Sequence, residues 1–201
     1  MYNIILAAGL SSRMKQNKLL LKYKDKTFLH HLVKASFDDN LDVIIVTGCY
    51  EEEITLEIKS LEKLYNKKIY ITHNKNYKTG QLSSLITGVI KLKSLNNTEP
   101  YFISVGDIPF LIKGDFASLL PHLEDHDALR PFVNGTYGHP VLINNRITDE
   151  IIALDYKNKK EGLRSFLKKK DTIAFHSSNQ AYIRDIDTKE AYETLISKPL
   201  L

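Results

Sequence analysis

The first 110 residues alternate short apolar runs with amphipathic stretches, and this alternation constrains the fold more than any other feature of the chain. Between the runs, apolar residues recur at three- and four-residue spacing, which is the period of a helix with one buried face. Strands that alternate with helices are joined by right-handed crossovers and form a parallel sheet. We therefore expect an α/β fold of three layers, with a mostly parallel central sheet and helices on both faces. The runs expected to form strands are Tyr2–Leu6, Val43–Thr47, Lys68–Thr72 and Tyr101–Val105.

The pattern changes after Pro109, where the apolar runs become shorter and lose their regular alternation with helices. We expect this part to complete the fold and to carry a second substrate. The expected helices are Asp115–Leu123, Ile147–Leu154, Gly162–Lys169 and Thr188–Ser197. The expected strands are Ala128–Pro131, Pro140–Ile143, Thr172–Phe175 and Ala181–Arg184. There is no internal repeat or linker, and 201 residues suit one domain with a sizeable core. Residues 1–201 are therefore assigned to a single domain.

Composition and charge exclude several classes of protein. The formal net charge is +4 and the lysines are scattered rather than clustered with aromatic residues, so no nucleic acid is expected as a partner. The N-terminus lacks the pattern of a signal peptide, and no apolar run approaches the roughly 20 residues of a membrane helix. We therefore expect a cytoplasmic protein that does not bind a membrane. The single cysteine, Cys49, follows an apolar run and is expected to be buried.

The connection after the first expected strand, Ala8–Lys18, has the composition of a polyphosphate-binding loop. In an open α/β sheet, ligands bind in the crevice at the carboxyl ends of the strands, where this connection lies. Its small residues let backbone amides approach a ligand, two serines add hydroxyl donors, and Arg13 and Lys18 supply positive charge. The loop matches neither GxxxxGKS/T nor GxGxxG, so neither a P-loop ATPase nor an NAD enzyme is expected.

Two aspartates are candidate metal ligands. Asp107 follows the fourth expected strand, within the sequence GDIP, and should reach the same crevice as the first loop. Mg²⁺ typically binds one or two carboxylates together with phosphate oxygens. Asp187, before the last expected helix, could supply the second carboxylate or could simply cap that helix. Mg²⁺ is therefore the expected cofactor.

With these residues identified, the chain resembles the MobA-like NTP transferase family, and within it the molybdenum cofactor cytidylyltransferases. The resemblance covers nearly the whole chain, and the motifs follow one another in the family's order. They are LAAGLSSRMKQNKLLL at Leu6–Leu21, NYKTGQLSSL at Asn76–Leu85, GDIP at Gly106–Pro109, GHPVL at Gly138–Leu142, GLR at Gly162–Arg164 and DIDT at Asp185–Thr188. The chain departs from the family at Lys15, where a glycine is usual.

The resemblance implies an Mg²⁺-dependent nucleotidyltransferase with a Rossmann-like fold, whose first half (about 1–110) binds the nucleotide and whose second half (about 111–201) binds the acceptor. The implied catalytic residues are Arg13, Lys18 and Asp107, and Asp107 and Asp187 are the implied Mg²⁺ ligands. The residues implied to bind the nucleotide are Leu6, Ala7, Ala8, Gly9, Ser11, Ser12, Arg13, Lys18, Gly80, Ser83 and Ser84. Those implied to bind the acceptor are Gly138, His139 and Arg164. His139 could also be a structural histidine beside a turn.

The resemblance further implies the substrates. Relatives with LAAG in the first motif tend to use cytosine and those with LAGG guanine, so Ala8 favours CTP. CMP would then pass from CTP to the terminal phosphate of molybdopterin bearing molybdenum, and pyrophosphate would leave. Two alternatives stay open. The acceptor could be a sugar phosphate or an alcohol phosphate, or the protein could be a non-catalytic carrier that delivers the cofactor to a molybdenum hydroxylase, its candidate partner.

Overall fold

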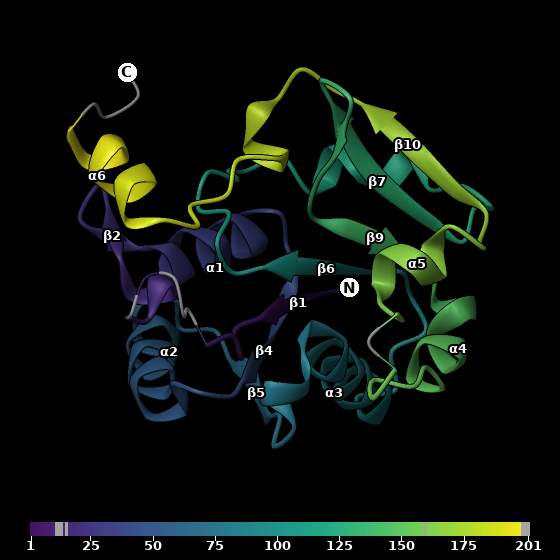
Figure 1. Ribbon diagram of the computed structural model, residues 1–201, viewed down its shortest axis with the longest axis horizontal. Coiled ribbons are helices and arrows are strands. Elements are labelled where there is room, and N and C mark those ends of the chain that lie inside the picture. The colour runs from purple at the N-terminus through teal and green to yellow at the C-terminus, as the bar shows by residue number, and fades with distance from the viewer. Residues whose placement is uncertain (11–13, 15, 159, 198–201) are drawn as a thin grey trace.

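A computed structural model describes residues 1–10, 14, 16–158 and 160–197. Its centre is an eight-stranded sheet with the order β10-β7-β9-β6-β1-β4-β5, in which β8 pairs with β7 (Figure 1). Neighbouring strands are parallel except around β9, which runs antiparallel to β6 and β7, and at the β7–β8 pair. The strands are β1 (Tyr2–Leu6), β4 (Asp42–Thr47), β5 (Ile69–His73), β6 (Tyr101–Val105), β7 (Ala128–Val133), β8 (Thr136–Tyr137), β9 (Val141–Ile143) and β10 (Thr172–His176).

Helices and short helical turns connect these strands, and a small hairpin follows the first loop. The α-helices are α1 (Phe28–Asp38), α2 (Glu51–Tyr65), α3 (Gln81–Ser94), α4 (Thr148–Ile152), α5 (Leu163–Leu167) and α6 (Lys189–Ser197). The 3-10 helices are η1 (Lys18–Leu20), η2 (Tyr77–Thr79), η3 (Ala117–His122), η4 (Asn145–Ile147) and η5 (Gln180–Tyr182). The strands of the hairpin are β2 (Lys22–Tyr23) and β3 (Lys26–Thr27). In the part of the chain described, no helix has the length and apolar character needed to cross a membrane.

The strand order places the switch point of the sheet beside β1. From β1 the chain passes to β4 and β5 on one side, and it then returns to form β6 on the other side of β1. Leu6, the last residue of β1, pairs in register with Val105, the last residue of β6. Connections that leave a sheet in opposite directions open a crevice at the carboxyl ends of its strands. The loops after β1 and β6 therefore border the same crevice.

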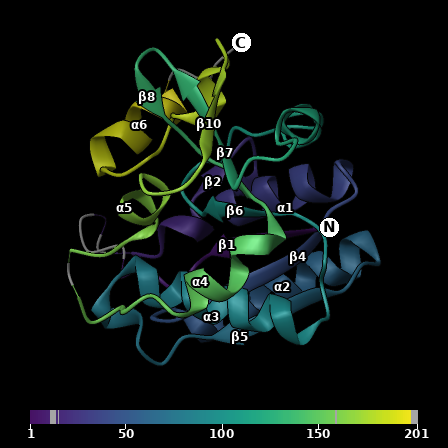
Figure 2. The same cartoon turned by 90° about the vertical axis from the view of Figure 1, so that its right-hand side faces the viewer.

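Alternate residues of the central strands point to opposite faces of the sheet, and each face buries its own core. On one face, Ile5 of β1 clusters with apolar residues of α1 and α2, such as Leu32. On the other face, Ile4 clusters with apolar residues of α3, α4 and α5, such as Val89. Figure 2 shows α1 on one side of the sheet and α3 and α5 on the other. The continuous apolar character of the strands thus reflects burial on both faces, and the predicted three-layer fold is confirmed.

The segment Ala181–Arg184 was predicted as a strand, and this prediction is wrong. Its first two residues belong to η5, which begins where the Asn179 side chain accepts a hydrogen bond from the Ala181 amide (3.0 Å). The Tyr182 side chain is buried, and its hydroxyl donates to the Asp115 carbonyl oxygen (2.8 Å). The apolar residues here therefore anchor a capped helical turn rather than a pleated strand.

Cys49 is exposed, so the expectation of a buried cysteine is also wrong. β4 ends at Thr47, and Cys49 lies in the turn that leads to α2. Its amide donates to the Ala8 carbonyl oxygen at 3.5 Å. The backbone of Cys49, rather than its side chain, is therefore the part tied to the first loop.

Candidate active site

A cavity of about 290 Å³, the first cavity, lies at the switch point. Its walls come from the loop after β1, from η1, from the start of α3 and from the loop after β6. Asp107 lines it, and so do six of the residues predicted to bind a nucleotide. These six are Leu6, Ala8, Gly9, Lys18, Gly80 and Ser84. The structure therefore brings together, around one hollow, segments that are far apart in the sequence.

Other predicted nucleotide-binding residues have different positions. Ala7 is buried behind the first cavity, where its amide donates to the Val46 carbonyl oxygen (2.9 Å). Ser11, Ser12 and Arg13 lie outside the described residues. Their roles in binding phosphate, and that of Arg13 in catalysis, stay predictions.

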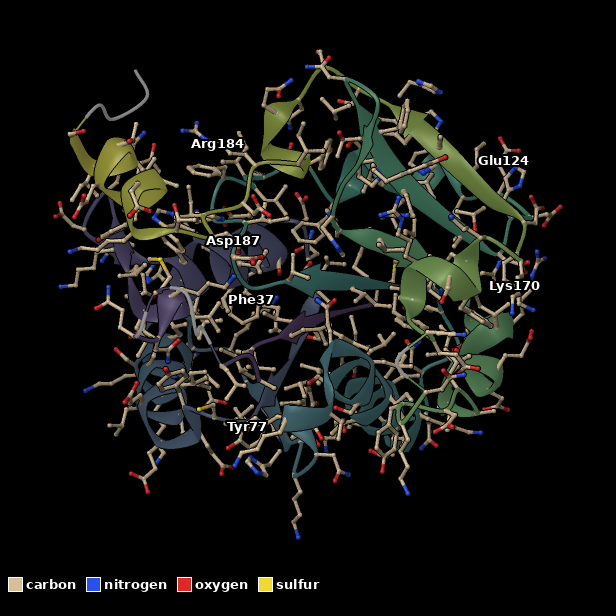
Figure 3. All side chains as sticks on the ribbon, in the orientation of Figure 1. Phe37, Tyr77, Glu124, Lys170, Arg184 and Asp187 are labelled. Carbon is tan, nitrogen blue, oxygen red and sulfur yellow. The ribbon has the colours of Figure 1, made fainter. Side chains whose placement is uncertain are left out.

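Lys18 joins the two aspartates predicted to bind a metal. Its Nζ donates to Asp187 Oδ1 (2.9 Å) and forms an ion pair with Asp107 Oδ2. Burial disfavours the charge on Lys18, but the two carboxylates outweigh burial and raise the pKa of Lys18. The Ile186 amide donates to the Asp107 carbonyl oxygen (3.2 Å), which ties together the two segments that carry the aspartates. Figure 3 shows Asp187 on the segment that leads into α6, close to the central strands.

These carboxylates have the chemistry of a site for a hard cation. Asp107 Oδ1 is buried and has no hydrogen-bond partner within the described ranges of the chain. A buried carboxylate oxygen without a partner is costly, so a ligand that completes it is favoured. Asp185 lies near the same carboxylates, and burial together with the charges of Asp187 and Asp107 raises the pKa of Asp185. Mg²⁺ fits this chemistry, because it typically binds one or two carboxylates while phosphate oxygens complete its coordination.

The start of α3 is fixed by a buried asparagine. Asn74, directly after β5, donates from Nδ2 to the hydroxyls of Ser83 (2.8 Å) and Ser84 (2.9 Å). Ser83 in turn donates to the Gly80 carbonyl oxygen (2.9 Å), so Ser83 supports the loop while Ser84 faces the first cavity. Gly80 has a φ of +124°, a conformation that side-chain-bearing residues rarely adopt. Asn74 was not identified from the sequence, although a polar residue after an expected strand was a signal for it.

A second cavity of about 540 Å³ adjoins the first. It extends along the sheet toward β9, β7 and α5, and His139 and Arg164 line it. That these two residues bind an acceptor stays a prediction. Arg130, from the middle of β7, lines it too and was not identified from the sequence. The residues shared by the two cavities are Leu6, Gly80 and Gln81. Two ligands, one in each cavity, would meet at this shared wall.

His139 lines the second cavity, in surroundings that disfavour a charge on its ring. Its Nδ1 lies 3.5 Å from the Ile103 carbonyl oxygen, and burial lowers the pKa of His139 despite that contact. Gly138 lies behind it, where an added Cβ would be 2.2 Å from the Tyr182 carbonyl oxygen. Gly138 therefore sets the position of His139 through close backbone packing, and it lines neither the first nor the second cavity.

The chain is similar in sequence to known proteins. Residues 3–173 match the family model of the MobA-like NTP transferase domain. The chain belongs to this family. The family predicted from the motifs is thereby confirmed, and the MobA-like membership makes the protein a nucleotidyltransferase with the Rossmann-like fold described above.

Individual relatives of this MobA-like protein cover almost its whole length. It is 31% identical to a molybdenum cofactor cytidylyltransferase of Escherichia coli (strain K12), over 95% of this chain and 93% of the relative. It is 26% identical to a probable molybdenum cofactor guanylyltransferase of Bacillus cereus (strain B4264), over 94% of this chain and 92% of the relative. The crystal structure of an Rv0371c homologue from Mycobacterium sp. strain JC1 has a TM-score of 0.78 at 20% identity, covering 98% of this chain and 94% of that chain. That likeness concerns the fold alone.

Proposed function

We propose that this MobA-like protein transfers CMP from CTP to the terminal phosphate of molybdenum-bearing molybdopterin and releases pyrophosphate. The observation that carries the proposal is the pair of adjoining cavities, with Lys18 and Asp107 lining the first and His139 and Arg164 lining the second. A nucleotide and a phosphorylated acceptor would meet where the cavities join. The name of the 31% identical relative, a molybdenum cofactor cytidylyltransferase, supports both substrates.

The choice of CTP depends on Ala8. Its side chain is buried at the first cavity, and the backbone packs closely behind it: an added Cβ on Gly48 would lie 2.7 Å from the Ala8 Cβ. The methyl group of Ala8 therefore has no room to withdraw for a larger purine base. One methyl group in a pocket discriminates by about 1–3 kcal/mol, which corresponds to a preference of roughly tenfold to a hundredfold.

The reaction depends on positioning and charge neutralisation. An oxygen of the acceptor phosphate attacks the α-phosphorus of CTP, a new P–O bond forms, and the bond to the β-phosphate oxygen breaks, so that pyrophosphate leaves with the electron pair. The attacking oxygen is already anionic, and no strong base is needed. Lys18, which the neighbouring carboxylates hold in its charged form, would offset the negative charge of the phosphates. Asp107 and Asp187 would hold Mg²⁺, which when bound supplies further positive charge to the phosphates.

On the acceptor side, His139 offers hydrogen bonding without a net charge. A neutral imidazole that directs Nδ1–H toward the Ile103 carbonyl oxygen presents Nε2 as an acceptor. Such an atom suits an N–H group of a pterin ring. Arg164 adds a positive charge to the same cavity, which suits an acceptor that is itself an anion.

Pyrophosphate release tests this proposal. The purified protein is incubated with Mg²⁺, molybdenum-bearing molybdopterin and either CTP, GTP, ATP or UTP. We expect kcat/KM with CTP to exceed that with GTP by at least about tenfold, and Ala8→Gly to narrow this ratio. A preference of the wild-type protein for GTP would overturn the assignment of the base.

The same assay separates the alternative functions. Pyrophosphate release with a sugar phosphate or an alcohol phosphate, but not with molybdopterin, would assign a different acceptor. Tight binding of molybdopterin with no release from any nucleotide would assign a carrier. The ion pair of Lys18 with Asp107 favours a catalytic protein, because a carrier has no need of a charged cluster in a cavity beside the one that would hold the cofactor.

A further inference from the structure

The ammonium group of Lys18 lies between the two candidate metal ligands. Its Nζ atom contacts Asp107 Oδ2 and also Asp187 Oδ1, at 2.9 Å from the latter. These oxygens come from the loop after β6 and from the segment that leads into α6, on which Figure 3 labels Asp187. Because both carboxylates contact one nitrogen atom, both can contact one cation placed there. The ammonium group and a metal ion would therefore compete for the same oxygen atoms.

This competition takes place largely away from water. The exposed fraction of the side chain is 21% for Lys18 and 16% for Asp107. Partly buried charges are screened by salt much less than charges on the surface. Two cations held by the same carboxylates would also repel each other. A metal ion can thus bind Asp107 and Asp187 together only if the ammonium group of Lys18 moves away.

The backbone around Lys18 is held by contacts that do not involve its ammonium group. The Asn17 side chain accepts a hydrogen bond from the Leu19 amide (3.1 Å), which caps η1. The Leu19 side chain is buried against Gly106, where an added Cβ would lie 2.1 Å from Leu19 Cδ2. A lysine side chain has a flexible stem of four carbons, so Nζ can change partners while η1 stays in place. Lys18 also lines the first cavity, where a phosphate would offer its Nζ other oxygens.

We propose that Lys18 is an internal counter-ion, which fills the metal site of the empty protein and which a metal ion must displace. The inference rests on the proposed function only where it names the phosphate that then receives Lys18. A divalent ion alone should bind weakly, because it has to remove the ammonium group from two carboxylates. A triphosphate in the first cavity offers that group anionic oxygens instead, so the metal and the nucleotide each favour binding of the other.

Removing the charge of Lys18 should strengthen the binding of a metal ion, although the same change should slow the reaction. Mn²⁺ prefers the same oxygen ligands as Mg²⁺ and is detected by electron paramagnetic resonance, so it is titrated into each protein without nucleotide or acceptor. Lys18→Met and Lys18→Gln should each lower the Kd for Mn²⁺ by at least about tenfold, the effect of removing one competing charge-assisted contact. Lys18→Arg keeps the competing charge, so its Kd should stay within about threefold of the wild-type value.

Two further variants show whether the gain belongs to this site. Lys22→Met removes a charge from the exposed first residue of β2 and should leave the Kd for Mn²⁺ unchanged. Asp107→Asn, combined with Lys18→Met, should abolish the gain, because one of the two carboxylates is lost. A thermal melt supplies a second readout: Mg²⁺ should raise the Tm of Lys18→Met more than that of the wild type, because a ligand that binds more tightly stabilises the folded protein more.

The outcome of the titration is independent of the proposed function. It contains no CTP and no acceptor, so it decides the role of Lys18 even if pyrophosphate release fails with every acceptor. A Kd for Mn²⁺ that is the same in the wild type and in both neutral variants, or that is higher in the variants, would overturn the proposal. Mn²⁺ that binds neither Lys18→Met nor Lys18→Gln measurably would overturn it as well.

Discussion

Replacing Gly138 with alanine tests how closely the turn before His139 packs on the rest of the protein. An ideal Cβ at Gly138 would lie 2.2 Å from the Tyr182 carbonyl oxygen and 2.8 Å from its carbonyl carbon. Both are backbone atoms, so rotation of a side chain cannot relieve the contact. The turn must move, and the His139 amide must give up its hydrogen bond to the same carbonyl oxygen (2.8 Å).

The expected magnitude follows from these two effects. Overpacking costs about 1–3 kcal/mol and a lost hydrogen bond about 1 kcal/mol, so Gly138→Ala should lower the free energy of unfolding by about 2–4 kcal/mol. Equilibrium urea denaturation measures this change. Gly162→Ala is the matched control, because nothing lies within 4 Å of its Cβ and its φ of −177° suits any residue, and it should change stability by less than about 0.5 kcal/mol. Equal stability of the two variants would refute the close approach and the placement of His139 that depends on it.

Three further predictions concern the site and the fold. Asp107→Ala should keep the circular dichroism spectrum of the wild type but lower kcat by more than about a hundredfold, and near-normal turnover at saturating Mg²⁺ would contradict its role. Burial raises the pKa of Asp127, but hydrogen bonds from Arg146 and the Asp171 amide outweigh burial and lower it below 3.8. Asp127→Asn should therefore lower the free energy of unfolding at neutral pH, and this difference from the wild type should vanish as the pH falls through the lowered pKa of Asp127. A difference in urea denaturation that does not change with pH would refute this. Asn74→Ala should lower the free energy of unfolding by about 1–3 kcal/mol and raise the KM for CTP. An unchanged KM would show that the start of α3 does not take part in binding CTP.

The strands whose bounds agree fully with the prediction, β1 and β6, lie in the middle of the sheet. β1 and β6 begin and end with their apolar runs, because every residue of a central parallel strand meets a layer of helices. At Ala181–Arg184 the few apolar residues suit a strand and a helical turn equally, and the Asn179 cap decides for the turn. The β2–β3 hairpin was not expected, because its turn places Lys24 and Asp25 at positive φ without the usual Asn-Gly signal.

The candidate site also contains some residues that could be predicted from the sequence and others that could not. Lys18 and Asp107 could be identified because each lies in a loop directly after an expected strand, where a parallel sheet collects its ligand-binding residues. Arg130 could not be identified, because it lies within β7 and reaches the second cavity only through the position of β7 beside β9. The order of strands in a sheet depends on tertiary packing, and the periodicity of one sequence does not record it. Residues whose function depends on that order become visible only in the structure.

The ion pair between Lys18 and Asp187 spans 169 positions of the chain, and this separation has a consequence for biosynthesis. The central strands β1, β4, β5 and β6 are all complete once Val105 has been made. A nascent chain can thus assemble the middle of its sheet while Asp187, one of the two carboxylates that pair with Lys18, is still to be translated. The charge balance of the site is among the last features to form, so a message cut short before Asp187 would yield a chain that has its central strands but lacks one of its two candidate metal ligands.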